Sequence, residues 1–206
     1  MTQADAFLQA IVEQPEDIAI RLIFADWLDE NGESPRGEFI RVQIELATLP
    51  DARRHEPLSV REMVLLNRER ELLSEPRHFV NWVPLIFHSG SGAGIRVAKP
   101  PRVELTGIGF QWVTFRRGFV ESVTCTAADW IQHAAEIRRA APIREVTLTD
   151  VPTVYYGADQ NSYEIAGSLD MPCITQGTLV GYWRRQAASF LLPLRFPGIA
   201  FTLPPA

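Results

Sequence analysis

The chain has 206 residues, of which 46% are hydrophobic and 22% are charged. This length and composition are ordinary for a folded globular protein with one sizeable core or two small ones, and they exclude a mainly disordered chain. The formal net charge of −5 gives no electrostatic reason to bind a phosphate backbone, which requires clustered Lys and Arg. Nucleic acid is therefore disfavoured as a partner.

Charge and cysteine usage bound the organisation and the setting of the chain. Residues 1–86 contain 16 acids and 9 bases, whereas residues 87–206 contain 9 acids and 11 bases, and such asymmetry predicts two modules of different composition. Two cysteines, Cys125 and Cys173, are too few for a disulfide framework. The first residues lack a signal-peptide pattern and no run of 18 apolar residues occurs, so we expect a cytoplasmic protein without a membrane span.

Apolar residues at helical spacing predict two helices before Gly32. The first covers about residues 5–12. The second begins near residue 17 and ends at Asn31-Gly32, since both residues tolerate the left-handed conformation that closes a helix. We assign the buried stripe of this second helix to six apolar residues: Ile18, Leu22, Ile23, Ala25, Trp27 and Leu28.

Two further helices have recognisable starts. Ser34 is predicted as the N-cap of the third helix and Pro35 as its first residue. In the fourth helix, Ser59 and Glu62 form an S-x-x-E capping box, in which each side chain satisfies a backbone N–H of the other residue. Residues 76–84 are expected to form a short segment that lies across the helices.

The second and third helices resemble a known family. Their distinctive residues are Ala25-Asp26-Trp27-Leu28, Glu30, Gly32, Arg36, Glu38-Phe39-Ile40-Arg41 and Gln43. This pattern is similar to the short repeat-companion domain of planctomycete and myxobacterial proteins, which is often found near leucine-rich-type repeats. The resemblance covers about residues 7–49 and implies a helical fold without an assigned activity. Gly37 departs from the alanine expected in the family, and glycine inside a helix costs up to about 1 kcal/mol relative to alanine.

The second half of the chain predicts strands alternating with helices. Gly, Ser and Pro are frequent in residues 87–102, which predicts a linker or a long loop. Short strands are then predicted at residues 103–105, 110–115, 119–125 and 144–148, with a helix capped by Thr126 and Asp129 before the last of them. A right-handed crossover through this helix would make the strands on either side of it parallel.

Beyond residue 150 the pattern weakens. An inserted hairpin is predicted in residues 154–175, a helix in residues 178–192 and a parallel strand in residues 198–203. The phrase RRGFVESV, followed by a helix and REVTLTD, is similar to the repeat region that accompanies the companion domain. Because only one clear unit and one degraded unit are visible, and a repeat array normally needs three or more, the N-terminal helices or an oligomeric neighbour would complete the core.

We therefore predict an α+β chain in three parts. A helical repeat-companion domain occupies residues 1–86, and a linker or long loop occupies residues 87–102. An α/β, leucine-rich-repeat-like domain with a small, mostly parallel sheet occupies residues 103–206.

Candidates for chemistry are few. Four acidic residues crowd the end of the second helix: Asp26, Asp29, Glu30 and Glu33. Their spacing does not fit an EF-hand loop, which leaves a solvated or salt-bridged face and a protein-contact patch as the main interpretations. Asp26 is expected to pair with Arg36 or Arg41 and so to fix the angle between two helices. No catalytic, metal-ligand or cofactor-binding spacing occurs, so we predict no catalytic residue, no metal and no cofactor.

Arginine and tyrosine residues supply the other candidates. Arg116-Arg117 could bind an anion or form a solvated turn, and Tyr155 and Tyr156 could anchor a partner, because arginine and aromatic residues dominate binding hot spots. The candidate partner-binding residues are Asp29, Glu30, Glu33, Arg116, Arg117, Tyr155 and Tyr156.

The absence of a catalytic motif favours a non-enzymatic protein–protein interaction or assembly module, with a protein partner or a second copy of the chain as its target. One alternative is an enzyme or small-molecule-binding protein, with carboxylates of the first module facing Arg116, Arg117 or Arg144 of the second. Another alternative is a structural component of a phage or shell particle.

Overall fold

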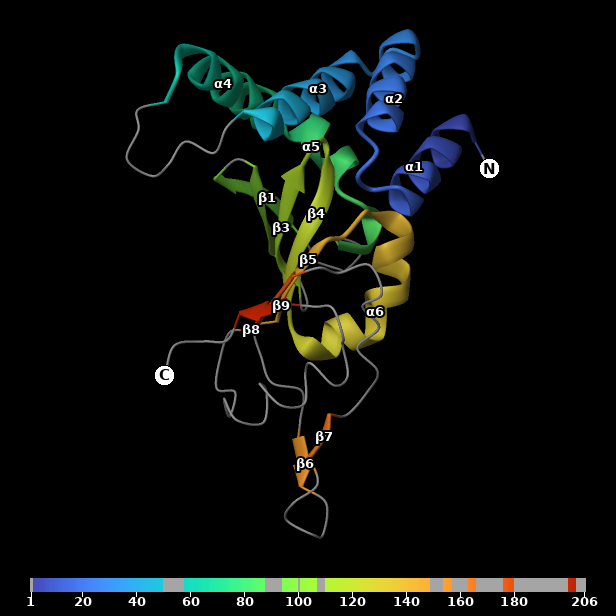
Figure 1. Cartoon of the computed structure of the whole chain (residues 1–206), viewed down its shortest axis with the longest axis vertical. Coiled ribbons are helices and arrows are strands. Elements are labelled where there is room, and N and C mark those ends of the chain that lie inside the picture. The colour runs from blue at the N-terminus through green and yellow to red at the C-terminus, as the bar shows by residue number, and fades with distance from the viewer. Residues whose placement is uncertain are drawn as a thin grey trace.

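The computed structural model describes residues 2–49, 58–87, 94–99, 101–106, 110–148, 154–156, 163–165, 176–179 and 200–202. Helices come first in the chain and a sheet follows, which confirms the α+β class. In Figure 1, α3 and α4 lie across one end of the sheet, and α6 lies beside β5. Among the described residues, none of the helices is both long and apolar enough to cross a membrane.

The N-terminal layer consists of helices that begin and end at local signals. They are α1 (Gln3–Glu13), α2 (Ile18–Glu30), α3 (Ser34–Thr48), α4 (Val60–Ser74), α5 (Pro76–Trp82) and the short 3-10 helix η1 (Leu85–Phe87). Asp17 caps α2, and Gly32 follows its end with a φ of +82°, as predicted. The capping box of α4 is confirmed, because Ser59 Oγ accepts the Glu62 N–H at 3.1 Å and the Glu62 carboxylate accepts the Ser59 N–H at 3.3 Å.

The start of α3 differs from the prediction. Ser34 is the first helical residue, and Glu33 occupies the cap position without a side-chain hydrogen bond. The Glu33 N–H donates to the carbonyl of Leu28 at 2.8 Å, so the last turn of α2 is hydrogen-bonded to the residue that precedes α3. The connection between the two helices is therefore very short. Pro35 thus lies one position further into the helix, where an N–H would still lack an intrahelical acceptor.

Within the described part of the chain, seven strands form one sheet in the order β1-β2-β3-β4-β5-β8-β9, and two form a separate pair, β6-β7. The strands of the first half are β1 (Gly94–Lys99), β2 (Arg102–Thr106), β3 (Phe110–Arg116) and β4 (Phe119–Cys125). After α6 (Ala127–Ala140) come β5 (Glu145–Leu148), β6 (Val154–Tyr156), β7 (Tyr163–Ile165), β8 (Gln176–Leu179) and β9 (Ala200–Thr202).

The sheet is mixed, so the prediction of a mostly parallel sheet is wrong. β1, β2, β3 and β4 pair antiparallel in succession, because their connections are too short for a crossover. Parallel pairing begins between β4 and β5, on either side of α6, as the β-α-β prediction required. The predicted linker is also corrected, since β1 lies inside it and pairs with β2.

The later elements agree only in part with the sequence. β6 and β7 pair antiparallel, as expected of the inserted hairpin, and β9 is parallel to β8. Thr178 lies in β8 and pairs with β5, so the predicted helix does not begin there. The rest of that predicted helix, residues 180–192, falls outside the described residues.

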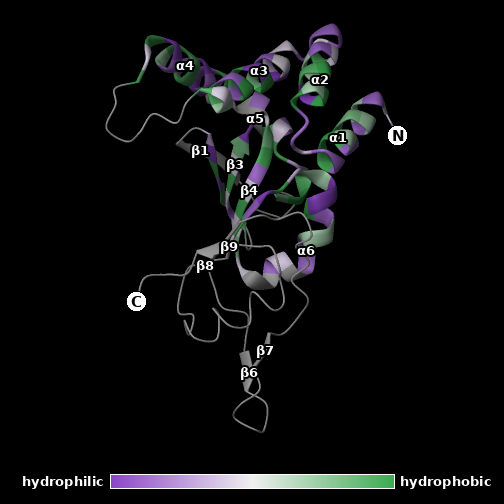
Figure 2. Ribbon diagram, viewed as in Figure 1, coloured by the Kyte–Doolittle hydropathy of each residue, from purple (hydrophilic) through white to green (hydrophobic). Residues whose placement is uncertain are grey.

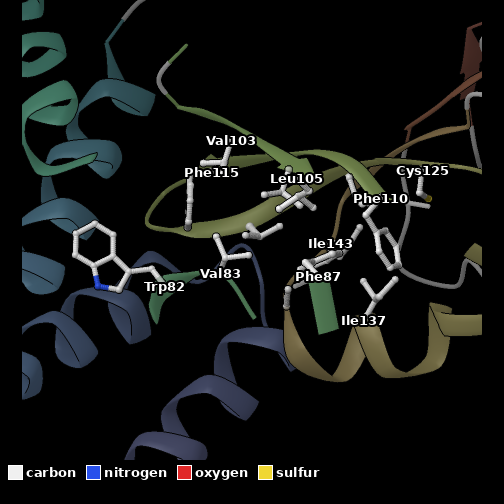
Figure 3. Packing of buried hydrophobic residues seen from close by; sticks show 14 of the residues in the cluster. Trp82, Val83, Phe87, Val103, Leu105, Phe110, Phe115, Cys125, Ile137 and Ile143 are labelled. Carbon is white, nitrogen blue, oxygen red and sulfur yellow. The ribbon is translucent and has the colours of Figure 1, made fainter. Parts of the chain in front are cut away.

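Among the described residues, the larger of two hydrophobic clusters joins the helices to the sheet (Figure 3). Phe39 of α3 stacks on Trp82 of α5, with ring centroids 4.9 Å apart, and Phe115 of β3 meets it edge-on at 5.4 Å. Trp130 and Ile137 of α6 belong to the same cluster and are fully buried. Residues assigned to different predicted domains therefore pack in the same hydrophobic cluster.

The buried face of α2 is not the stripe that apolar spacing suggested. Ala25 and Leu28 are buried as expected, but Leu22 is exposed and Ile23 is 56% exposed. The helices carry both hydrophobic and hydrophilic bands in Figure 2, as expected where one face packs and the other meets water. On α2, the buried band includes one charged residue, Arg21.

Gly37 is required by the close packing of α2 on α3. A Cβ atom at residue 37 would lie 2.7 Å from the carbonyl oxygen of Ala25 and 2.9 Å from Oδ1 of Asp29. We expect Gly37→Ala to lower the free energy of unfolding by about 1–3 kcal/mol through overpacking, although alanine is the better helix former. Urea denaturation measures the change, and a variant as stable as the parent protein would contradict the explanation.

Candidate functional site

The acidic cluster at the end of α2 is divided between ion pairs and water. Arg41 of α3 donates to Asp26 Oδ1 at 2.6 Å and to Asp29 Oδ2 at 2.7 Å. The predicted bridge from Asp26 to the next helix is therefore confirmed, although the exposure of both carboxylates limits each contact to about 1 kcal/mol or less. Of the candidate acids, Asp29 is engaged within the protein, whereas Glu30 and Glu33 are exposed to solvent.

The arginines of the β3–β4 turn form ion pairs within the protein. Arg117 donates to both carboxylate oxygens of Glu121, at 3.1 and 2.7 Å, and to Glu16 at 3.0 Å. These hydrogen bonds, that to Glu121 above all, raise the pKa of Arg117. Arg116 is more exposed and donates to Glu145 at 3.1 Å. Neither arginine is therefore simply solvated, and both already have an anionic partner.

A buried ion pair lies beneath this turn. Arg21 of α2 is fully buried and Glu121 of β4 is 3% exposed, and Arg21 Nη1 lies 2.9 Å from Glu121 Oε1. Arg21 also donates to the backbone carbonyls of Arg117 at 3.0 Å and of Pro15 at 2.7 Å. Burial lowers the pKa of Arg21 while Glu121 opposes that shift, and a guanidinium is not deprotonated in proteins.

The pair extends to the surface through Glu16. This carboxylate accepts hydrogen bonds from Arg117 and Arg144, and the bond from Arg117 is the main cause of its lowered pKa. The arginines expected to line a site between the modules thus face the protein's own carboxylates at bonding distance. This geometry removes the main support for a substrate site at that place.

A small cavity lies at the junction of α1 and α6. Its volume is about 20 Å³, and it is lined by Val12, Pro15, Arg138, Ala141, Pro142 and Ile143. Such a cavity has room for a single water molecule, whereas small-molecule sites usually exceed roughly 300 Å³.

A second polar bridge ties α3 and α4 to the β3–β4 turn. Gln43 Oε1 accepts the N–H of Gly118 at 2.7 Å, and its Nε2 donates to Glu69 Oε1 at 2.9 Å and to the Phe115 carbonyl at 3.4 Å. Gln43 and Glu69 are both buried. Burial raises the pKa of Glu69, because the charged carboxylate is poorly solvated there.

Replacing Glu69 with glutamine should change how stability depends on pH. A carboxyl group whose pKa is raised on folding stabilises the protein below its unfolded pKa, and that contribution is lost as the pH rises through the folded pKa. Glu69→Gln keeps an acceptor for Gln43 without the charge, so its stability relative to the parent protein should increase from pH 4.5 to pH 7. Urea midpoints at the two pH values test this, and a constant difference would count against it.

The remaining candidates divide between the core and the undescribed parts of the chain. Tyr155 and Tyr156 lie in β6, but their side chains are outside the described residues, as is Cys173, so their role stays a prediction. Cys125 is buried in β4, where burial raises the pKa of its thiol, as suits a core residue rather than a nucleophile. In the residues that the structure describes, His, Cys, Asp and Glu side chains nowhere gather as a set of three metal ligands.

Two apolar surfaces remain on the helices. On α4, three large side chains at one-turn spacing, Val60, Met63 and Val64, are exposed by 74%, 44% and 52%; we call them the α4 face. Between α1 and α2, an open groove of about 300 Å³ is lined by Gln3, Ala6, Phe7, Ala10, Ile20 and Ile23; we call it the α1–α2 groove.

Sequence reasoning missed the residues that join the helices to the sheet. Arg21 precedes Phe24, Ala25 and Leu28 by three, four and seven positions, which places it on their helical face and was a usable signal of burial. Glu121 had a comparable signal, because it alternates with Phe119, Val123 and Cys125 along one strand and so shares a face with these buried residues. The pairing of the two depends on contacts between distant parts of the chain.

Comparisons with known proteins found no relative of this chain. No family model matches the chain, and no curated protein or solved structure matches it either.

Proposed function

We propose that the protein is a non-enzymatic interaction or assembly module, which binds another protein or a second copy of itself through its N-terminal helices. The main support for this proposal is the exposed α4 face. Val60 and Val64 lie one turn apart and are more than half exposed, where a helix that served only the core would carry polar residues. Exposed apolar side chains grouped in this way are typical of protein-contact surfaces.

The charged groups support a binding role over a catalytic one. Arg21 and Arg117 are both paired with Glu121 inside the protein. Their geometry suits a device that fixes the angle between helices and sheet, and a substrate would have to break these pairs to reach them. The apolar surfaces, in contrast, are open to solvent.

The same proposal includes the family and the architecture of the second half. The resemblance of α2 and α3 to the repeat-companion domain is supported by the helical hairpin they form. The β4-α6-β5 unit, with parallel strands on either side of one helix, is consistent with a single leucine-rich-type repeat. The antiparallel β1–β4 would then close the end of a short array, in the manner of a capping unit.

Native co-purification of the tagged full chain, combined with a light-scattering mass, tests the interaction function. The parent protein should carry a partner in fixed stoichiometry or have the mass of an oligomer. Val60→Glu combined with Val64→Glu should abolish that association, because two charges would have to be buried at the contact. Gln132→Glu adds a charge to an exposed position of α6, on a different helix from the α4 face, and should leave the association intact.

A strictly monomeric protein that recovers no stoichiometric partner would overturn the proposal. Equal recovery of the partner by the Val60/Val64 variant, with its melting curve unchanged, would overturn the assignment to the α4 face.

A further inference from the structure

The α1–α2 groove is apolar, and its lining residue Phe7 is packed against two other aromatic rings. Phe7 of α1 lies 5.4 Å from Phe24 and 6.0 Å from Trp27 of α2, measured between ring centroids. Ala6 and Ala10 leave space along one wall, and Ile23 forms part of the other while being 56% exposed. An apolar side chain that entered the groove would therefore meet Phe7, whose ring is held in place by Phe24 and Trp27.

The charged residues of the two helices that form the groove are almost all acidic. Between Thr2 and Glu30 the sequence has seven acids, namely Asp5, Glu13, Glu16, Asp17, Asp26, Asp29 and Glu30, and one base, Arg21. That base is fully buried against Glu121 and cannot meet a partner.

Two of these carboxylates lie on the faces that form the groove. Glu13 follows Ala10 by three positions on α1, and Glu30 follows Ile23 by seven positions on α2, so each shares a helical face with a groove-lining residue. Both are exposed. The remaining acids cap helices or pair with Arg41, Arg117 and Arg144.

We propose that the α1–α2 groove binds a basic amphipathic helix of a partner protein. This inference rests on the proposed interaction function and names the partner's chemistry. The apolar stripe of the incoming helix fills the groove between two helices, as ridges fill grooves in helix packing, and its Lys or Arg residues face Glu13 and Glu30. Charge complementarity of this kind helps to select the partner and speeds association.

Calorimetric titration of the full chain with synthetic peptides tests the inference. The probe is a helical peptide of about 18 residues, five turns long, with leucine on one face and lysine on the other; the control peptide has glutamate in place of lysine. The lysine peptide should bind, and its affinity should fall at least tenfold between about 50 and 500 mM NaCl because salt screens the exposed charges. The glutamate peptide should not bind measurably.

Two matched variants locate the site. Ile23→Ser should weaken binding of the lysine peptide at least tenfold, whereas Val64→Ser, a similar change at a similarly exposed residue of α4, should leave it unchanged. Glu13→Gln combined with Glu30→Gln should weaken binding and flatten its salt dependence. No binding of the lysine peptide at millimolar concentration, or equal effects of Ile23→Ser and Val64→Ser, would overturn the proposal.

A second copy of the chain in the groove would overturn the proposal, and the groove and α4 assignments can fail separately. If Ile23→Ser converts an oligomer into a monomer in light scattering, the groove holds a second copy. If the peptide fails to bind while association through the α4 face persists, only the groove assignment is lost. If association through the α4 face is absent while the peptide binds, the groove assignment stands and the α4 assignment fails.

Discussion

Glu121→Gln is expected to lower the free energy of unfolding by about 3–5 kcal/mol, the usual cost of breaking a buried ion pair by removing one partner. Arg21 would remain fully buried without its counter-charge. Arg117 would lose its two-point contact as well, although it would keep Glu16. Urea denaturation at pH 7 gives the difference directly.

Two further variants separate the buried charge from general disruption. Arg21→Met should cost less than Glu121→Gln, because Glu121 would still be paired with Arg117. Combining the two changes should cost less than their sum, since the unpaired buried charge is then absent. Arg61→Met removes an ion pair at the surface, with Glu45, and should leave the urea midpoint unchanged within error. If Glu121→Gln were as mild as Arg61→Met, the buried pair would not be what joins α2 to the sheet.

Gly118→Ala is expected to destabilise the protein by roughly 2–5 kcal/mol, from backbone strain and overpacking together. The φ of Gly118 is +87°, and a Cβ atom there would lie 2.4 Å from Cγ1 and 2.9 Å from Cα of Ile40 on α3. Because one of these atoms belongs to the main chain of a buried helix, rotation of a side chain cannot relieve the contact. The turn would have to move away from α3 and break the hydrogen bond from Gly118 to Gln43.

Gly32→Ala is the matched control for this prediction. Gly32 has nearly the same φ, +82°, but a Cβ atom there would meet nothing within 4 Å. Only the backbone preference is then lost, at a cost of about 1 kcal/mol. Thermal or urea unfolding of both variants gives the cost of the clash, which is the destabilisation by Gly118→Ala minus that by Gly32→Ala. Equal losses would mean that Ile40 accommodates the added methyl group.

Features encoded within a few residues could be predicted from the sequence. The capping box of Ser59 and Glu62, the end of α2 at Gly32 and the bridge from Asp26 to Arg41 depend on neighbours in the chain or on adjacent helices. Helix and strand identities in residues 103–148 followed in the same way from local period and capping.

The arrangement of the sheet and of the buried charges could not be predicted in this way. Whether neighbouring strands run parallel depends on which strands meet, and β1 was hidden in a segment whose composition is typical of loops. The burial of Arg21 was visible in its spacing, but its partner lies 100 positions away. The apolar groove was missed for a related reason: Ile23 was assigned to the core because it is apolar, although its exposure is what makes it a candidate for binding.

The Arg21–Glu121 pair also constrains the order in which the chain can fold during its synthesis. Arg21 is made 100 residues before its counter-charge, which corresponds to about 5–20 s at ordinary rates of translation. During that interval its guanidinium has only water and local backbone carbonyls such as that of Pro15, so the face of α2 that carries it cannot be dehydrated at low cost. The inner face of the first helices therefore stays hydrated while the following residues are synthesised. These helices pack against the sheet as a late step, once β4 has been made.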